Sequence, residues 1–318
     1  MSVSLVLAAD IGGTAMRAAL VDRGGGVRAR AAAPTLPERG LDDAADRLGA
    51  MLAEVREAAA GDDVMAAGVS TAGPIDPTTG TYRDAPNLPG WDGLTMKPAL
   101  ETALSLPVAV GHDATLAAVA EVEFGAGRGM SDLVYVTVST GIGAGIIANG
   151  VSVTGVSGGA GEAGHLIVQP GGPSCAVGCS GCLEALASGS GIAAEARRRL
   201  EAGSDSRLGA VANLSARDVF AAAADGDELA GAVVDGAIRH LGAGLAGLLA
   251  IFDPELLVLG GGVMEGLRPR WDDLVEATRE QALPRYAEHL PLMVSPLGES
   301  VSLLGAAVLA FRLVEAGN

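Results

Sequence analysis

An acidic residue followed by two glycines and a hydroxyl is the first segment of this chain suited to chemistry. Asp10 lies at the end of an apolar run that predicts a buried strand, and Gly12, Gly13 and Thr14 follow after Ile11. Backbone N–H groups in such a turn can hold a phosphate, Thr14 adds a hydroxyl donor, and Asp10 is placed to hold Mg²⁺. A ligand-free Gly-Gly hairpin would show the same pattern, so this segment alone leaves both interpretations open.

A second segment repeats this order of apolar strand, hydroxyl, glycines and apolar strand. We expect a strand over 132–139, a glycine-rich turn that begins at Thr140 and Gly141, and a strand over 146–148. Two such hairpins indicate a duplicated fold that holds the phosphates of one nucleotide between its halves. A third glycine run, with Gly261 and Gly262, follows a strand expected over 255–259 and offers another close approach to a ligand.

Asp113 lies where a short strand over 107–111 gives way to a helix over 114–124. An aspartate there is a good helix N-cap, worth about 1 kcal/mol. A carboxylate at the carboxyl end of a strand, beside a cleft, is also well placed to act as a general base. Both roles are consistent with the sequence.

Other polar residues stand in loops. Gly73 lies in a turn-rich loop after a strand over 64–70, and Asn87 lies in a Pro-Gly loop, where it can either cap a turn or bind ligand hydroxyls. The cysteines at 175, 179 and 182 lie within eight positions, which favours metal binding over disulfides in a cytosolic chain.

Composition limits the function classes. The 318 residues are 49% hydrophobic, which is enough for a large core and favours two domains. A formal net charge of −17 argues against binding to nucleic acid or anionic membranes, although it does not forbid a nucleotide ligand. With no leader sequence and no apolar run long enough to span a bilayer, we expect a cytoplasmic protein.

The remaining apolar periodicity predicts an α/β chain. Besides the segments above, strands are expected over 15–22, 27–33 and 292–296. Helices are expected over 41–60, 191–201, 216–224, 228–252 and 302–314.

Together these motifs resemble the ROK family of sugar kinases and related repressors, over essentially the whole chain. The resemblance includes Asp10–Thr14 and 139–143 as phosphate motifs, 260–262 as an adenosine motif, and 87–91 as a sugar loop. It implies two ribonuclease H-like (actin-like ATPase) domains with a cleft between them. The smaller domain would comprise 1–112 plus a closing helix in 303–318, and the larger one 113–302 with a zinc-type loop.

The resemblance also implies the chemistry. Asp113 would be the general base for ATP-dependent phosphorylation of the C6 hydroxyl of glucose or a similar sugar, with Mg²⁺ at the phosphates. Residues implied to bind the sugar are Gly73, Asn87, His112, Glu162, His165 and Glu184. Residues implied to bind the nucleotide and its metal are Asp10, Gly12, Gly13, Thr14, Thr140, Gly141, Gly261 and Gly262.

Two positions depart from the family pattern. Val177 stands where the family has a zinc-binding cysteine, and Cys179 appears two places later, so Zn²⁺ would need His165, Cys175, Cys179 and Cys182 in a rewrapped loop. Alternatively, Cys179 points away and zinc is weak or absent. His112 replaces the family asparagine, which is either a tolerated change or a sign of specificity for an amino sugar or a cyclitol.

Two other functions are compatible with the family resemblance. A ROK repressor would carry a DNA-binding domain ahead of Asp10, for which the sequence leaves no room, and a non-catalytic sugar sensor would not need Asp113. The expected partners are therefore a small sugar and ATP, with no nucleic acid or membrane. The resemblance also implies a homo-oligomer, either a dimer or a tetramer.

Overall fold

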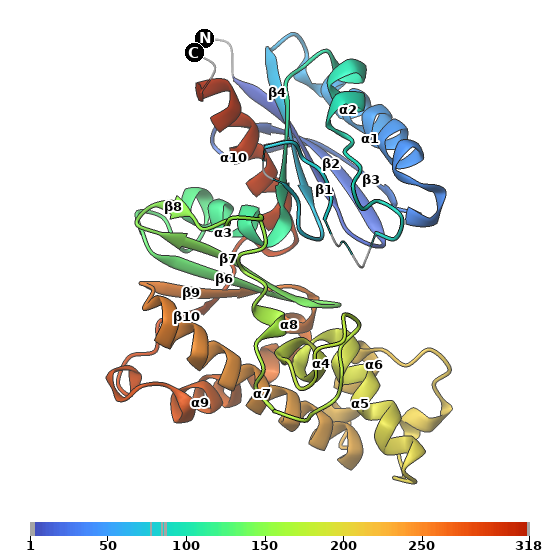
Figure 1. Cartoon of the computed structure of the whole chain (residues 1–318), viewed down its shortest axis with the longest axis vertical. Helices are drawn as coiled ribbons and strands as arrows, with labels where there is room; N and C mark the ends of the chain where they lie inside the picture. The colour runs from blue at the N-terminus through green and yellow to red at the C-terminus, as the bar shows by residue number, and fades with distance from the viewer. Residues whose placement is uncertain (1–3, 77, 84, 86–87, 317–318) are drawn as a thin grey trace.

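The computed structural model describes residues 4–76, 78–83, 85 and 88–316. This part of the chain forms two five-stranded mixed sheets, stacked one above the other in Figure 1. The first sheet has the order β3-β2-β1-β4-β5, with β1 Leu5–Ile11, β2 Ala15–Asp22, β3 Val27–Pro34, β4 Val64–Thr71 and β5 Val108–His112. The second has the order β10-β9-β6-β7-β8, with β6 Leu133–Val138, β7 Ile142–Ala148, β8 Val151–Ser152, β9 Leu256–Gly260 and β10 Leu292–Val294.

Helices cover both faces of both sheets, so the central strands are nearly continuous apolar runs, whereas the edge strand β3 alternates between half-buried and exposed residues. The helices are α1 Leu41–Arg56, α2 Lys97–Leu104, α3 Asp113–Phe124, α4 Leu183–Ala187, α5 Gly189–Glu201, α6 Ala216–Ala224, α7 Glu228–Phe252, α8 Gly262–Leu267, α9 Trp271–Gln281 and α10 Val301–Ala316. The 3-10 helices are η1 Pro37–Arg39, η2 Glu57–Ala59, η3 Ala163–His165, η4 Arg207–Ala210, η5 Arg268–Arg270, η6 Pro284–Tyr286 and η7 Gly298–Ser300.

Three apolar cores fill the spaces between the sheets and the helices. The first lies between the outer face of the first sheet and α1 and α2, and the third lies between the second sheet and α4 to α9. The middle core joins both sheets through α3 and α10, which Figure 1 shows at their junction. Alternation along single strands divides the side chains between cores: Val134 and Val136 face α4 to α9, whereas Leu133 and Tyr135 face α3 and α10.

Glycines allow the middle layers to approach one another through their backbones. A Cβ at Gly68 of β4 would lie 1.9 Å from the carbonyl oxygen of Ala306 in α10. One at Gly305 of α10 would lie 2.2 Å from the carbonyl oxygen of Leu116 in α3. A Cβ at Gly145 of β7 would lie 2.0 Å from the carbonyl oxygen of Ala114, also in α3. Any larger residue at these positions would push the layers apart.

The parallel strands of the first sheet place polar groups along one edge. β1, β4 and β5 run in the same direction, and the register aligns Asp10 with Ser70 and Ser70 with Gly111. The next row aligns Ile11, Thr71 and His112. The turn after β1 and the start of α3 therefore lie at the same edge of the sheet.

Helix α7 is long and apolar enough to cross a membrane by length and composition alone, although the sequence analysis found no apolar run of that length. Within the described residues, however, it is a core helix that packs against α4, α5, α6 and α9. Its apolar composition is accounted for by this burial.

Several element boundaries expected from the sequence are wrong. The run 143–145, expected as part of a turn, lies inside β7, because its glycines serve the contact with α3 rather than a change of direction. The helices α2, α4, α8 and α9 were not expected, and the helix over 41–60 ends at Arg56. The second strand, Ala15–Asp22, has the bounds that the sequence predicts.

Candidate active site

The turn between β1 and β2 is tight and open on its outer side. The N–H of Gly12 donates to the carbonyl of Ala15 at 2.9 Å, which closes the turn, and Thr14 is exposed at its tip. The turn therefore presents the backbone of Gly12 and Gly13 and the Thr14 hydroxyl at the sheet edge that carries Asp10.

A buried threonine directly after β3, which the sequence did not indicate, supports this turn. The Thr35 hydroxyl donates to the Gly12 carbonyl at 2.6 Å, and the Thr35 N–H donates to the Thr14 carbonyl at 3.0 Å. Arg47 donates to the Thr35 carbonyl and is itself paired with Asp43 at 2.7 Å. This chain of bonds fixes the turn before any ligand arrives.

Asp10 is a buried carboxylate with one nearby cation. Its Oδ2 lies 3.6 Å from Arg17 Nη1, and its side chain is 14% exposed. Burial, and then the negative charge of Asp113, raise the pKa of Asp10 from 3.8 to about 6, against the opposing effect of Arg17. A divalent cation here would relieve the repulsion between the two carboxylates. Arg17 is paired with Asp10 across the β1–β2 hairpin. Aligning these two strands in the sequence would have indicated this contact.

Asp113 is the first residue of α3, directly after β5. Its Oδ1 accepts the N–H of Ala114 at 2.6 Å and lies 3.2 Å from His112 Nε2. Within the described part of the chain both contacts are made by Oδ1, so Oδ2 is the oxygen that remains for a substrate. The carboxylate is one-third exposed, which suits a group that meets a ligand.

The second turn, between β6 and β7, is held by the start of α5. The Gly189 N–H donates to the Ser139 carbonyl at 2.7 Å, and the Ser190 hydroxyl donates to the Thr140 carbonyl at 2.8 Å. Thr140 itself is exposed, as Thr14 is in the first turn. The structure thus presents two glycine-containing hairpin turns, one at the edge of each sheet.

Glu184 of α4 lies against this second turn. Its Oε2 accepts the N–H of Ile142 at 3.0 Å, and a Cβ at Gly141 would lie 2.5 Å from the same oxygen. Glycine at 141 therefore lets the carboxylate reach the backbone. The sequence suggested Gly141 for phosphate contact, whereas this approach of Glu184 is a second reason for a glycine there.

The third glycine run follows β9. Gly261 has φ +94°, and its Cβ would lie 2.4 Å from the Val138 carbonyl, so this position requires glycine twice over. Gly262 then begins α8. Because β9 and β6 are parallel neighbours, this run lies at the same edge of the second sheet as the 139–141 turn.

Of the residues expected to contact a sugar, His112 ends β5 and Glu184 lies in α4. Gly73 has φ +88°, and its Cβ would lie 2.8 Å from that of Ala85, so it too requires glycine. Asn87 lies outside the described residues. Glu162 directly precedes η3 and His165 is its last residue, with Glu162 Oε2 3.8 Å from His165 Nε2.

Four metal-ligand side chains meet beside η3. His165 Nδ1 and the sulfurs of Cys175, Cys179 and Cys182 all lie within 4.8 Å of one another. A hairpin-like turn brings two of them together, since the Cys175 N–H donates to the Cys179 carbonyl at 2.9 Å. Val177 lies at the tip of this turn and is 56% exposed. The Cys179 sulfur therefore belongs to the cluster.

This donor set fits a tetrahedral zinc ion. Bond lengths of about 2.0–2.3 Å imply ligand atoms about 3.3–3.8 Å apart in such a site. Cys179 Sγ lies 3.3 Å from His165 Nδ1 and 3.1 Å from Cys175 Sγ, and Cys175 Sγ lies 3.9 Å from His165 Nδ1. Small adjustments would bring all of them to zinc.

The sequence model of the ROK family matches residues 6–312. This chain belongs to the ROK family. It is 32% identical to the glucokinase of Thermotoga maritima over 306 residues, which is 95% of this chain and 96% of that protein. It is 34% identical to an N-acetylmannosamine kinase of Shigella flexneri over 305 residues, 96% of this chain and 98% of the relative.

Among solved structures, the ROK glucokinase from Streptomyces griseus in complex with glucose and AMPPNP is similar over 97% of this chain and 99% of its own, with 33% identity and a TM-score of 0.83. The expected fold class of two actin-like domains is confirmed by such ROK neighbours together with the two mixed sheets. The division into residues 1–112 plus 303–318 and 113–302 stays a prediction.

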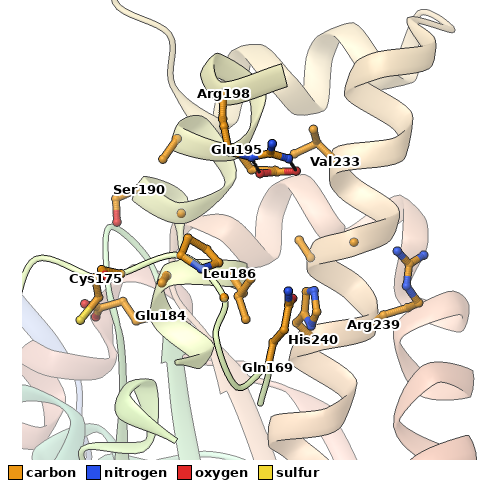
Figure 2. A pocket seen from close by; sticks show the side chains of 18 of the residues that line it. Gln169, Cys175, Glu184, Leu186, Ser190, Glu195, Arg198, Val233, Arg239 and His240 are labelled. Carbon is orange, nitrogen blue, oxygen red and sulfur yellow. Dashed lines mark hydrogen bonds and ion pairs between the residues drawn. The ribbon is translucent and has the colours of Figure 1, made fainter. Parts of the chain in front are cut away.

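A cavity of about 800 Å³ lies beside Cys175 and Glu184 and is also lined by residues of α5 and α7. Figure 2 shows Cys175 and Glu184 together on one side of it, with Gln169 and His240 on another. Neither Asp10 nor Asp113 is among the residues that line it. The cavity is therefore separate from the centre that the carboxylates of Asp10 and Asp113 form.

Proposed function

We propose that this protein transfers the γ-phosphate of ATP to the primary C6 hydroxyl of glucose or a glucose-like sugar, with Asp113 as general base. The chain is a sugar kinase of the ROK family, whose relatives include glucokinases and N-acetylmannosamine kinases. The observation that carries the proposal is the environment of Asp113, whose Oδ1 is held while Oδ2 remains for a hydroxyl. That oxygen would take the proton as the hydroxyl attacks phosphorus.

The nucleotide would lie between the two glycine turns. Backbone N–H groups of Gly12, Gly13 and Gly141, with the hydroxyls of Thr14 and Thr140, would contact its phosphates. The run at Gly261 and Gly262 would approach the adenosine. Mg²⁺ at Asp10 would supply positive charge to the phosphates, while the Thr35 brace keeps the first turn fixed.

Sugar hydroxyls would be oriented by groups from both halves of the chain. The carboxylates of Glu162 and Glu184 would accept hydrogen bonds from sugar hydroxyls, and His165 presents its Nε2 on the side of Glu162. Gly73 leaves room for the ring, and Asn87 would supply an amide. Closure of the two domains over the sugar would keep water from the phosphate.

A coupled ADP-release assay tests this function directly. Glucose, mannose, N-acetylmannosamine, N-acetylglucosamine, glucosamine and a cyclitol would each be tested with ATP, and the product of the best substrate located by NMR. We expect turnover with at least one hexose and phosphate on C6. Tight sugar binding without turnover for any member would favour a sensor, and phosphate at C1 would contradict the proposed position of Asp113.

Replacing Gly141 with alanine is expected to lower kcat/KM for the sugar about tenfold, equivalent to about 1.4 kcal/mol. The new Cβ would displace Glu184 from its bond to the Ile142 N–H, but the displaced group is the end of a flexible side chain, so folding should survive. Steady-state kinetics and thermal unfolding check this. Gly247→Ala is the control, because a Cβ there meets nothing within 4 Å; equal kinetics for the two variants would contradict the role of Glu184.

We also propose that His165, Cys175, Cys179 and Cys182 bind a structural Zn²⁺. Bound through Nδ1, the ion would fix the His165 ring so that Nε2 stays on the sugar side. The reaction would take place in the cytoplasm, and the oligomeric state of the protein stays a prediction.

Cys179→Ser is expected to reduce zinc content from about one ion per chain to a small fraction and to lower the melting temperature. Elemental analysis after dialysis against a weak chelator measures the zinc. Val177→Ser is the matched control, since that side chain is exposed at the tip of the same turn. If Cys179→Ser retained its zinc, the rewrapped ligand set would be wrong.

A further inference from the structure

His112 is nearly buried and makes contacts with both ring nitrogens. Its side chain is 12% exposed, with Nε2 3.2 Å from Asp113 Oδ1 and Nδ1 3.5 Å from the Thr115 hydroxyl. Thr115 lies one turn further along α3. If the hydroxyl donates to Nδ1, the proton of a neutral imidazole is on Nε2, where it can be donated to the carboxylate.

We infer that His112 is a positioning residue for Asp113 and not a group that selects the sugar. This inference rests on the proposed role of Asp113 as the base. The amide of Ala114 donates to Oδ1 at 2.6 Å, and His112 adds a second donor to the same oxygen. Together they fix the rotation of the carboxylate, which is otherwise broad about its terminal bond, so that Oδ2 faces the hydroxyl.

Hydrogen bonding, and not close packing, must keep the imidazole in this place. A second cavity, of about 160 Å³, lies beside it and is lined by His112, Thr115, Leu116 and Val119 among others. The ring therefore has room to turn away from Asp113. Thr115 holds it on the side of the base, which links the hydroxyl, the imidazole and the carboxylate in one chain.

The test compares kcat and KM for His112→Ala, His112→Gln and Thr115→Val across the sugar panel. We expect His112→Ala to lower kcat about 10- to 100-fold for every sugar by the same factor, with sugar KM changed less than twofold. Glutamine should recover much of this loss, because its side-chain amide can donate to Oδ1. Thr115→Val should lower kcat in the same direction by a smaller factor.

Several results would overturn the inference. One is a changed order of preferred sugars, or a raised sugar KM at unchanged kcat, in His112→Ala, since either would mean that the imidazole contacts the substrate. Another is a glutamine variant that folds, as judged by its melting temperature, but stays as slow as the alanine variant. Asp113→Asn separates the two proposals: an active Asp113→Asn enzyme refutes the base itself, whereas an inactive one beside a fully active His112→Ala refutes only the positioning role.

Discussion

Asp113→Asn is expected to reduce kcat for sugar phosphorylation by about 10²- to 10⁴-fold while leaving the fold intact. The amide oxygen can still accept the Ala114 N–H and the His112 donor, so the start of α3 keeps its bonds. What is lost is the ability to take a proton from the attacking hydroxyl. The ADP-release assay measures kcat, and isothermal titration with sugar shows whether binding persists.

Glu280→Gln is the matched control for this charge change, because Glu280 is exposed on α9 and far along the chain from Asp10 and Asp113. It should leave kcat unchanged. Undiminished turnover in Asp113→Asn would remove the base from the mechanism, whatever the control showed.

Asp10→Asn is expected to abolish detectable turnover and yet raise the stability of the ligand-free protein at neutral pH. Burial first, and the charge of Asp113 second, raise the pKa of Asp10 from 3.8 to about 6 in the folded state. The protonated form therefore favours folding fully below about pH 4, and this contribution is lost as pH rises through 6. At pH 7.5 the folded wild type holds an unfavourable buried charge that asparagine lacks.

Urea unfolding in EDTA without nucleotide, from pH 5 to 8, measures the effect. We expect Asp10→Asn to exceed the wild type by roughly 1 to 3 kcal/mol at pH 7.5, with the difference shrinking toward pH 5. Asp22→Asn is a control of opposite sign: burial alone would raise the pKa of Asp22, but hydrogen bonds from Gly26 and Arg28 lower it. Its replacement should therefore destabilise the protein at neutral pH, and a destabilised Asp10→Asn would contradict the buried-charge argument.

The sequence predicted those elements whose signals are local. The strand Ala15–Asp22 follows from an apolar run after a glycine turn, and α7 from its helical periodicity. The run 143–145 was misread as a turn because the same glycine signal marks close packing, and only the position of Ala114 in α3 distinguishes the two. The amphipathic helix Trp271–Gln281 could have been found from its periodicity.

In the candidate site, the motif residues could be named from the sequence, but the residues that position them could not. Thr35 reaches Gly12 only because β3 pairs with β2, and no feature of the sequence around Thr35 indicates that contact. Nothing in the sequence distinguishes Thr115 from other helix residues, and only the structure shows its hydroxyl beside the His112 ring. Long-range register and rotamer choice determine such contacts, and neither can be read from spacing.

The glycine contacts of the middle layers have a consequence for motion. At Gly68, Gly145 and Gly305, backbone surfaces approach one another closely, in a series from the first sheet through α10 and α3 to the second sheet. Surfaces of this kind favour shear, in which packed layers slide by small steps while the core stays sealed. Because α3 carries Asp113 at its first residue, each such step would also adjust the carboxylate relative to Asp10, so the same interface would join domain movement to alignment of the reacting groups.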